Sequence, residues 1–225
     1  MVGLQKASKL FLEDDCDAIK HAIVEAEKHT SGEILPVVAS ASGRYDRAED
    51  IFGLFFSLIC VAVGWYWFHT NGVKASWDTF NFGLTSILLT IFFGFIIGVL
   101  LTHIFPALRL PFIAKLEMEE EVDRAAAAAF QQNRLRNTRD STGILIYISL
   151  YEHKVRILGD DAISGKLVHA DWNHICDAII NGFKEKQYTD GIVEGIALSG
   201  KLLAEHFPIK EGDKDELSNE LVIID

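Results

Sequence analysis

Two long apolar runs stand out from an otherwise mixed pattern of hydrophobic and polar positions. No Asp, Glu, Lys or Arg occurs in residues 51–73 or in residues 79–108. A helix needs about 20 mostly apolar residues to cross the hydrocarbon core of a bilayer. The pattern therefore predicts two transmembrane helices, at about 51–68 and 82–105, which a short connection joins into a hairpin in the lipid bilayer. A pair of buried helices in a soluble core is the alternative, but such helices rarely run this long without a charge.

Residues at the ends of these runs predict how the hairpin lies in a membrane. Trp65, Tyr66 and Trp67 end the first run and Trp77 precedes the second, and amphipathic rings are favoured at the level of the lipid headgroups. The connection carries one cation, Lys74, whereas the outer flanks carry four. These four are Arg44, Arg47, Arg109 and Lys115. Because positive charge favours the cytoplasmic side, we expect both termini and both soluble parts in the cytoplasm, at the inner (plasma) membrane.

A glycine step lies within the second apolar run. Gly94 and Gly98 are spaced as in the GxxxG pattern, which lets two helices approach closely. The step either closes the hairpin against the first helix or pairs two copies of the chain as a homo-oligomer. Glycine is also common in membrane helices, so a chance spacing remains open.

The segments outside the hairpin alternate between helical and extended periodicity. We expect helices at 13–28, 115–135, 170–186 and 190–206, and strands at 33–40, 144–150 and 155–158. One helix and one strand before the membrane cannot bury a core alone. The sequence therefore predicts a single α/β domain built from residues 1–50 and 109–225, interrupted by the hairpin at 51–108, with an acidic C-terminal tail.

Charge and cysteine content exclude several classes of function. The formal net charge is −11, of which residues 1–50 carry −4 and residues 109–225 carry −7. Neither soluble part offers the basic surface that nucleic-acid backbones require, so no nucleic acid is expected as a partner. Cys16, Cys60 and Cys176 lack the spacing of a disulfide framework or a zinc site.

Acidic residues near strand ends are the best candidates for a metal site. Asp160 and Asp161 follow the strand at 155–158, Asp140 precedes its expected partner strand, and Glu33 opens the first strand. Loop carboxylates that converge at one edge of a sheet bind hard cations such as Ca²⁺ or Mg²⁺. The alternative is structural, with Asp160 or Asp161 capping the next helix and Asp140 in a turn. No catalytic residues can be named, because the histidines have no metal-ligand or triad pattern.

The order of the helices, strands and apolar hairpin along the chain, together with several short sequence pieces, resembles that of the TPM-domain family. The resemblance covers nearly the whole chain outside the hairpin, and its most specific pieces are Thr30–Ile34, Thr142–Ile146, Glu152–Ile163 and Leu203–Pro208. Within this family, the sequence resembles a bacterial membrane branch in which two transmembrane helices split the domain. It implies a mixed central sheet with helices on both faces.

The resemblance implies two classes of function. Some members of the family resemble acid phosphatases or bind divalent cations, and others are accessory proteins of membrane complexes. We expect a non-catalytic, membrane-anchored module that binds membrane-protein partners. The alternative is a divalent-metal-dependent, phosphatase-like hydrolase.

Overall fold

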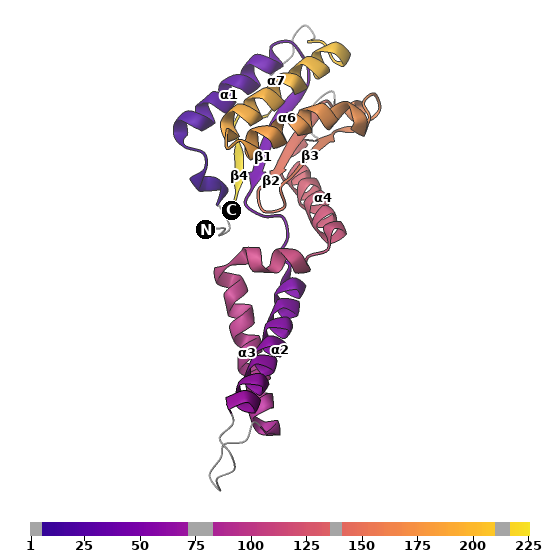
Figure 1. Cartoon of the computed structure of the whole chain (residues 1–225). Helices are drawn as coiled ribbons and strands as arrows, with labels where there is room; N and C mark the ends of the chain where they lie inside the picture. The colour runs from indigo at the N-terminus through magenta and orange to yellow at the C-terminus, as the bar shows by residue number, and fades with distance from the viewer. Residues whose placement is uncertain (1–5, 72–82, 136–140, 210–216) are drawn as a thin grey trace. The chain divides into compact units, whose positions relative to one another are not determined.

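The structure, a computed structural model, describes residues 6–71, 83–135, 141–209 and 217–225 (Figure 1). The chain divides into two compact units, and each is described separately. One unit spans Arg44–Lys115, and the other joins the chain up to Gly43 with Leu116–Asp225. The sequence places the same interruption at 51–108, so the unit that contains the apolar helices begins and ends several residues further out.

The second unit is an α/β domain built on a four-stranded mixed sheet, as predicted. The strand order is β3-β2-β1-β4. β1 pairs in parallel with both β2 and β4, whereas β2 and β3 form an antiparallel hairpin. The strands are β1 (Glu33–Ala39), β2 (Gly143–Ser149), β3 (Lys154–Gly159) and β4 (Val222–Ile224). Strands from both sides of the apolar segment thus share one sheet.

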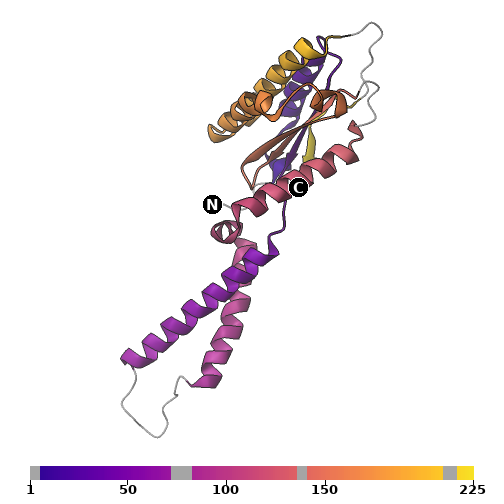
Figure 2. The ribbon, with the colours of Figure 1, turned by 90° about the vertical axis from the view of Figure 1, so that its right-hand side faces the viewer.

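Helices cover both faces of this sheet, as Figure 2 shows. Successive strand residues point to opposite faces, so each buried strand supplies two cores. Ile34 and Ile146 face the core formed with α1, α6 and α7, and Leu35 and Leu145 face the core formed with α4. The helices are α1 (Glu13–Glu27), α4 (Lys115–Gln132), α5 (Asp161–Ser164), α6 (Asn173–Lys184) and α7 (Tyr188–His206), with single 3₁₀ turns at η1 (Ala7–Lys9) and η4 (His169–Trp172).

Pro36 lies in the middle of β1, although proline is normally confined to edge strands, strand ends and bulges. The Glu33 N–H donates to the Thr142 carbonyl on the β2 side, at 3.3 Å. The backbone N–H positions of successive residues alternate between the two sides of a strand, so the backbone nitrogen of Pro36 faces the β4 side. β4 pairs only with the three residues that follow Pro36. No ladder hydrogen bond is lost there, which is why a proline is tolerated.

The first unit contains the two apolar helices, α2 (Asp46–Asn71) and α3 (Leu84–Ile104), followed by the 3₁₀ segment η2 (Pro106–Phe112). Both helices are long and apolar enough to cross a membrane. α2 already begins at Asp46, ahead of the predicted start of this helix at about residue 51. Asp46 and Glu49 occupy its first turn, where acids are favoured by the helix dipole.

The glycine step packs α3 against α2 within the chain. Gly94 and Gly98 are buried. A Cβ atom added at Gly98 would lie 2.8 Å from the Gly53 Cα atom, and one at Gly94 would lie 3.0 Å from the Ser57 Cα atom. The close approach of the two backbones therefore depends on glycine, which favours the intrachain interpretation of the GxxxG pattern.

Candidate functional site

The predicted acidic site lies at the edge of the sheet where β1 and β2 begin and β3 ends. Glu33 is the register partner of Gly143, and the Asp160 N–H donates to the Gly143 carbonyl at 2.9 Å. A Cβ at Gly143 would face Leu135, which belongs to the α4 core. Strand alternation places Glu33 and Asp160 on this same face. The two acidic residues therefore flank a glycine on this face, and the Leu135 side chain packs over that glycine.

Asp160 is the most deeply buried of the predicted site residues that the structure describes. Its exposed fraction is 3%, and Glu33 is buried as well. Asp160 occupies the N-cap position of α5, but its side chain makes no capping hydrogen bond. No described residue offers a hydrogen bond to its Oδ2 atom. The capping alternative is therefore right about the position of Asp160 and wrong about the bond.

Of the other two predicted residues, the structure describes only Asp161, and it does not complete this site. Asp161 is exposed in the first turn of α5, and Asp140 lies outside the described residues. Within the described ranges, no group of three or more His, Cys, Asp or Glu residues could hold a metal ion. Ca²⁺ takes six to eight oxygen ligands, whereas Mg²⁺ keeps several waters and often uses only one or two carboxylates. Glu33 and Asp160 thus fit part of a hydrated cation site.

A polar network that the sequence did not predict lies at the opposite edge of the sheet. Glu152 accepts hydrogen bonds from the backbone N–H groups of Ser42 and Gly43, at 3.0 and 3.3 Å, and from the Ser149 hydroxyl. The Ser42 hydroxyl lies 2.7 Å from the Ser149 hydroxyl and 3.1 Å from that of Tyr147. Burial raises the pKa of Tyr147, and Glu152 raises it further against the opposing effect of Ser42. This network fixes the chain where it leaves β1.

A second network joins three distant parts of the chain at the end of β4. Asp225 accepts hydrogen bonds from the Ser8 N–H at 3.1 Å, the Ser8 hydroxyl at 2.5 Å and the Ser40 hydroxyl at 2.9 Å. These bonds, the Ser8 hydroxyl first, lower the pKa of Asp225 to about 2. Nothing in the sequence pattern links these residues, because more than 180 positions separate Ser40 from Asp225.

In the apolar-helix unit, one buried ion pair lies where the two helices meet η2. Arg109 donates to Glu49 and, at 3.0 Å, to the Arg44 carbonyl, and its guanidinium lies 5.9 Å from the centre of the Tyr45 ring. The His103 Nδ1 atom lies 3.4 Å from the other Glu49 oxygen. The sequence identified Arg109 only as a flanking charge. Its partner was missed because 60 residues separate Glu49 from Arg109.

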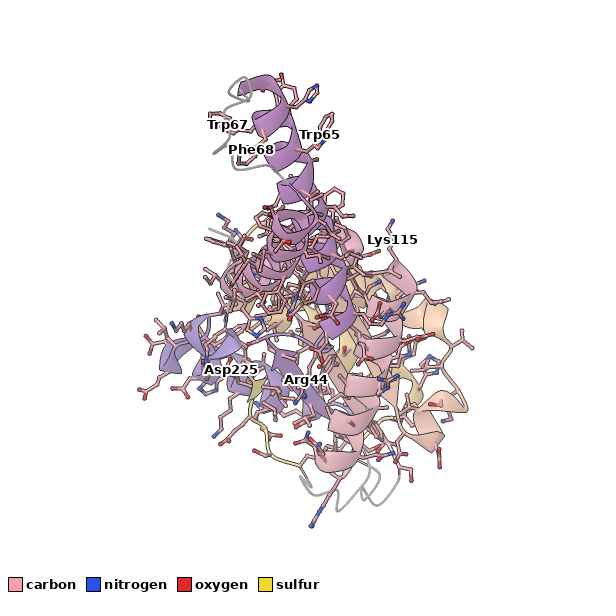
Figure 3. The ribbon with its side chains drawn as sticks, turned by 90° about the horizontal axis from the view of Figure 1, so that it is seen from below. Arg44, Trp65, Trp67, Phe68, Lys115 and Asp225 are labelled. Carbon is pink, nitrogen blue, oxygen red and sulfur yellow. The ribbon has the colours of Figure 1, made fainter. Side chains whose placement is uncertain are left out.

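The aromatic residues gather at the other end of the helix pair. Figure 3 shows Trp65, Trp67 and Phe68 pointing outward around the last turns of α2. Trp65 stacks on His69 with ring centres 4.9 Å apart. Within this unit, Arg44 and Lys115 mark the opposite end of the helices. The arrangement has the polarity expected of an interfacial aromatic belt and a basic flank.

A mixed α/β domain with a four-stranded sheet and a separate pair of apolar helices is thus the class of structure that these observations define. Residues 108–202 match the sequence profile of the TPM domain, so a TPM domain is present over that part of the chain. No curated protein matches the chain significantly.

Among solved structures, the chain is similar to the NMR structure of the BA42 protein from the psychrophilic bacterium Bizionia argentinensis. The identity is 22%, and the match covers 96% of this chain and 97% of that one, with a TM-score of 0.56. A likeness at this identity supports the fold alone. It agrees with the mixed sheet and its two layers of helices.

Proposed function

We propose that the chain is a membrane protein in which α2 and α3 anchor a TPM-type α/β domain, the membrane branch that the sequence resembles, and that this domain is an accessory module for partner proteins. The observation that carries the anchor is the exposure of the helix pair. Only 11% of the apolar window of each helix is buried within the protein. Apolar patches of this size are unfavourable in water, whereas a bilayer would cover them.

The sheet itself supports an even number of membrane crossings. β1 precedes the helix pair, β2 follows it, and the two strands pair over seven residues. Strands of one sheet must lie on one side of a membrane, so an odd number of crossings between them is incompatible with the fold. Together with the basic flank, this favours two crossings with both soluble parts on the cytoplasmic side of the inner membrane.

The anchor is tested by extraction and labelling. We expect the protein to stay in the membrane fraction after alkaline carbonate treatment, since two spanning helices hold it. In a background without native cysteines, Lys74→Cys should react with an impermeant maleimide on intact cells. Lys20→Cys is the matched control and should react only after lysis. Release by carbonate would contradict the anchor, and the reverse labelling would contradict the orientation.

The accessory role is supported by what the polar residues of the α/β domain do. The carboxylates of Glu152 and Asp225 are engaged by backbone N–H groups and serine hydroxyls of the fold. Trp172 and Cys176 pack in the α1, α6 and α7 core. Because these groups stabilise the domain, we expect the domain to function through surfaces that bind partner proteins.

One observation favours a second candidate, a divalent-cation site that would serve the phosphatase-like alternative. The Asp160 Oδ2 atom is buried at the same end of the sheet as Glu33, and a buried carboxylate oxygen is costly unless it is bonded. A Ca²⁺ or Mg²⁺ ion held by Asp160, Glu33 and waters would satisfy it and could act on a phosphate as a Lewis acid.

Thermal unfolding in increasing Ca²⁺ or Mg²⁺ tests the cation site. An ion at 100 times its dissociation constant should raise the free energy of unfolding by about 2.7 kcal/mol. Asp160→Asn should abolish the increase, whereas Asp161→Asn, at the exposed neighbouring position, should retain it. An unchanged unfolding temperature in the unsubstituted protein would leave these acids as structural residues and would remove the phosphatase-like alternative.

A further inference from the structure

The edge of β1 that faces β4 is closed to strand pairing over its first half. The Ile34 N–H on this side donates to the Glu27 carboxylate at 2.9 Å, and Pro36 has no N–H. From Val37 onward no such obstacle to strand pairing exists, and we call this stretch the open edge. In this structure β4 occupies it and pairs residue by residue with Val37–Ala39. The Ser40 N–H then donates to the Ile224 carbonyl at 2.8 Å. The open edge is therefore a short site with a defined register.

A carboxylate-binding site lies at the end of this open edge. Ser40 is buried, with an exposed fraction of 2%, and the Ala7 N–H donates to its hydroxyl oxygen at 2.8 Å. This bond directs the Ser40 hydroxyl toward Asp225, where the Ser8 N–H and hydroxyl also donate. Hydrogen bonds to an ionised group are about twice as strong as neutral ones. The site thus recognises an acid at one position of an extended segment.

The segment that occupies this edge is short and partly exposed. β4 has three residues, and each of them is only half-buried. Its neighbours alternate between the two cores, with Leu221 and Ile223 on the α1, α6 and α7 side and Val222 and Ile224 on the α4 side. Short, partly exposed elements open at lower free energy than central strands.

We propose that the open edge of β1, with Ser8 and Ser40, is a docking site for an extended partner segment of four aliphatic residues followed by an acid, and that β4 occupies this site from within the chain. Addition of a strand to a sheet edge is an established mode of peptide recognition, with alternate side chains giving specificity. The inference rests on the proposed accessory function only because such a module needs a partner surface.

A labelled peptide with the sequence of residues 217–225 tests the site on the full-length protein in detergent. Asp225→Asn weakens the internal segment and leaves Ser8 and Ser40 intact. We expect this variant to bind the peptide at least about 10-fold more tightly than the unsubstituted protein, because the competing charge is gone. Glu220→Gln is the matched control, since Glu220 is exposed and its ion pair with Lys20 spans 3.9 Å. It should bind like the unsubstituted protein.

The peptide in which Asn replaces Asp225 should bind the Asp225→Asn variant at least about 10-fold more weakly than the native peptide. Equal binding of both peptides, or no gain over the unsubstituted protein, would overturn the proposal.

Hydrogen exchange of the unsubstituted protein gives a readout that needs no variant. The Ser40 amide, which bonds β4, should exchange much faster than the Ala39 amide, which faces β2, and equal rates would show that β4 does not detach. Neither result bears on the carbonate extraction that tests the anchor.

Discussion

Arg109→Met is expected to lower the free energy of unfolding of the helix-pair unit by about 3–5 kcal/mol, because it removes the guanidinium from the buried Glu49 carboxylate and leaves the exposed His103 imidazole beside it. The side chains of Arg109 and Glu49 are only 10% and 11% exposed. The loss also removes the hydrogen bond to the Arg44 carbonyl. Unfolding by sodium dodecyl sulfate in mixed micelles, followed by tryptophan fluorescence, measures the effect, since three of the four tryptophans belong to this segment of the chain.

Two further variants distinguish the effect of breaking the buried ion pair from the effect of removing any positive charge. Lys115→Met removes an exposed cation from the same unit and should change the free energy by less than about 1 kcal/mol. Glu49→Leu combined with Arg109→Met should recover most of the loss, because an apolar pair in place of a buried ion pair is often neutral. A cost for Arg109→Met as small as that for Lys115→Met would show that the pair is effectively solvated.

Gly98→Ile is expected to destabilise the helix pair by about 1–3 kcal/mol or more, since overpacking at a tight contact forces backbone shifts. A Cβ at this position would meet the Gly53 Cα at 2.8 Å and the Gly53 carbonyl oxygen at 3.3 Å. Backbone atoms cannot move aside as a flexible side chain can, so the helices must separate. The same detergent titration measures the change.

Ala62→Ile is the matched control for Gly98→Ile, because Ala62 lies on the exposed surface of α2. An added side chain there meets no other part of the protein, so the free energy should stay within about 0.5 kcal/mol. If both variants behaved alike, the close approach of α2 and α3 would not depend on Gly98. The intrachain role of the glycine step would then be wrong.

Local pattern was sufficient to predict most of the elements of this fold. The run from Glu33 to Ala39 and that from Gly143 to Ser149 consist of apolar and β-branched residues typical of buried strands, and the structure confirms both. The apolar helices were equally clear from the absence of charge. β4 was missed because its three residues follow an acidic, polar stretch, and pairing with β1 rather than local propensity makes them a strand.

The candidate sites were predicted less completely, because they depend on contacts between distant residues. Asp160 was identified from its position at a strand end, and the sheet register brings it to the same edge as Glu33. The role of Asp225 could not be predicted, since it depends on Ser8 and Ser40 reaching it across the whole chain. The burial of Glu49 could not be predicted either, because its partner Arg109 follows both apolar helices in the sequence.

The pairing of β1 with β2 also orders events during synthesis. Roughly 100 residues separate the two strands, which at about 5–20 residues per second is a delay of several seconds or more between their emergence from the ribosome. During that time β1 and α1 have no partner strand, while the apolar helices have already been synthesised. In the proposed anchor, membrane insertion would therefore precede completion of the sheet, and a failure of insertion would leave β1 exposed to other chains.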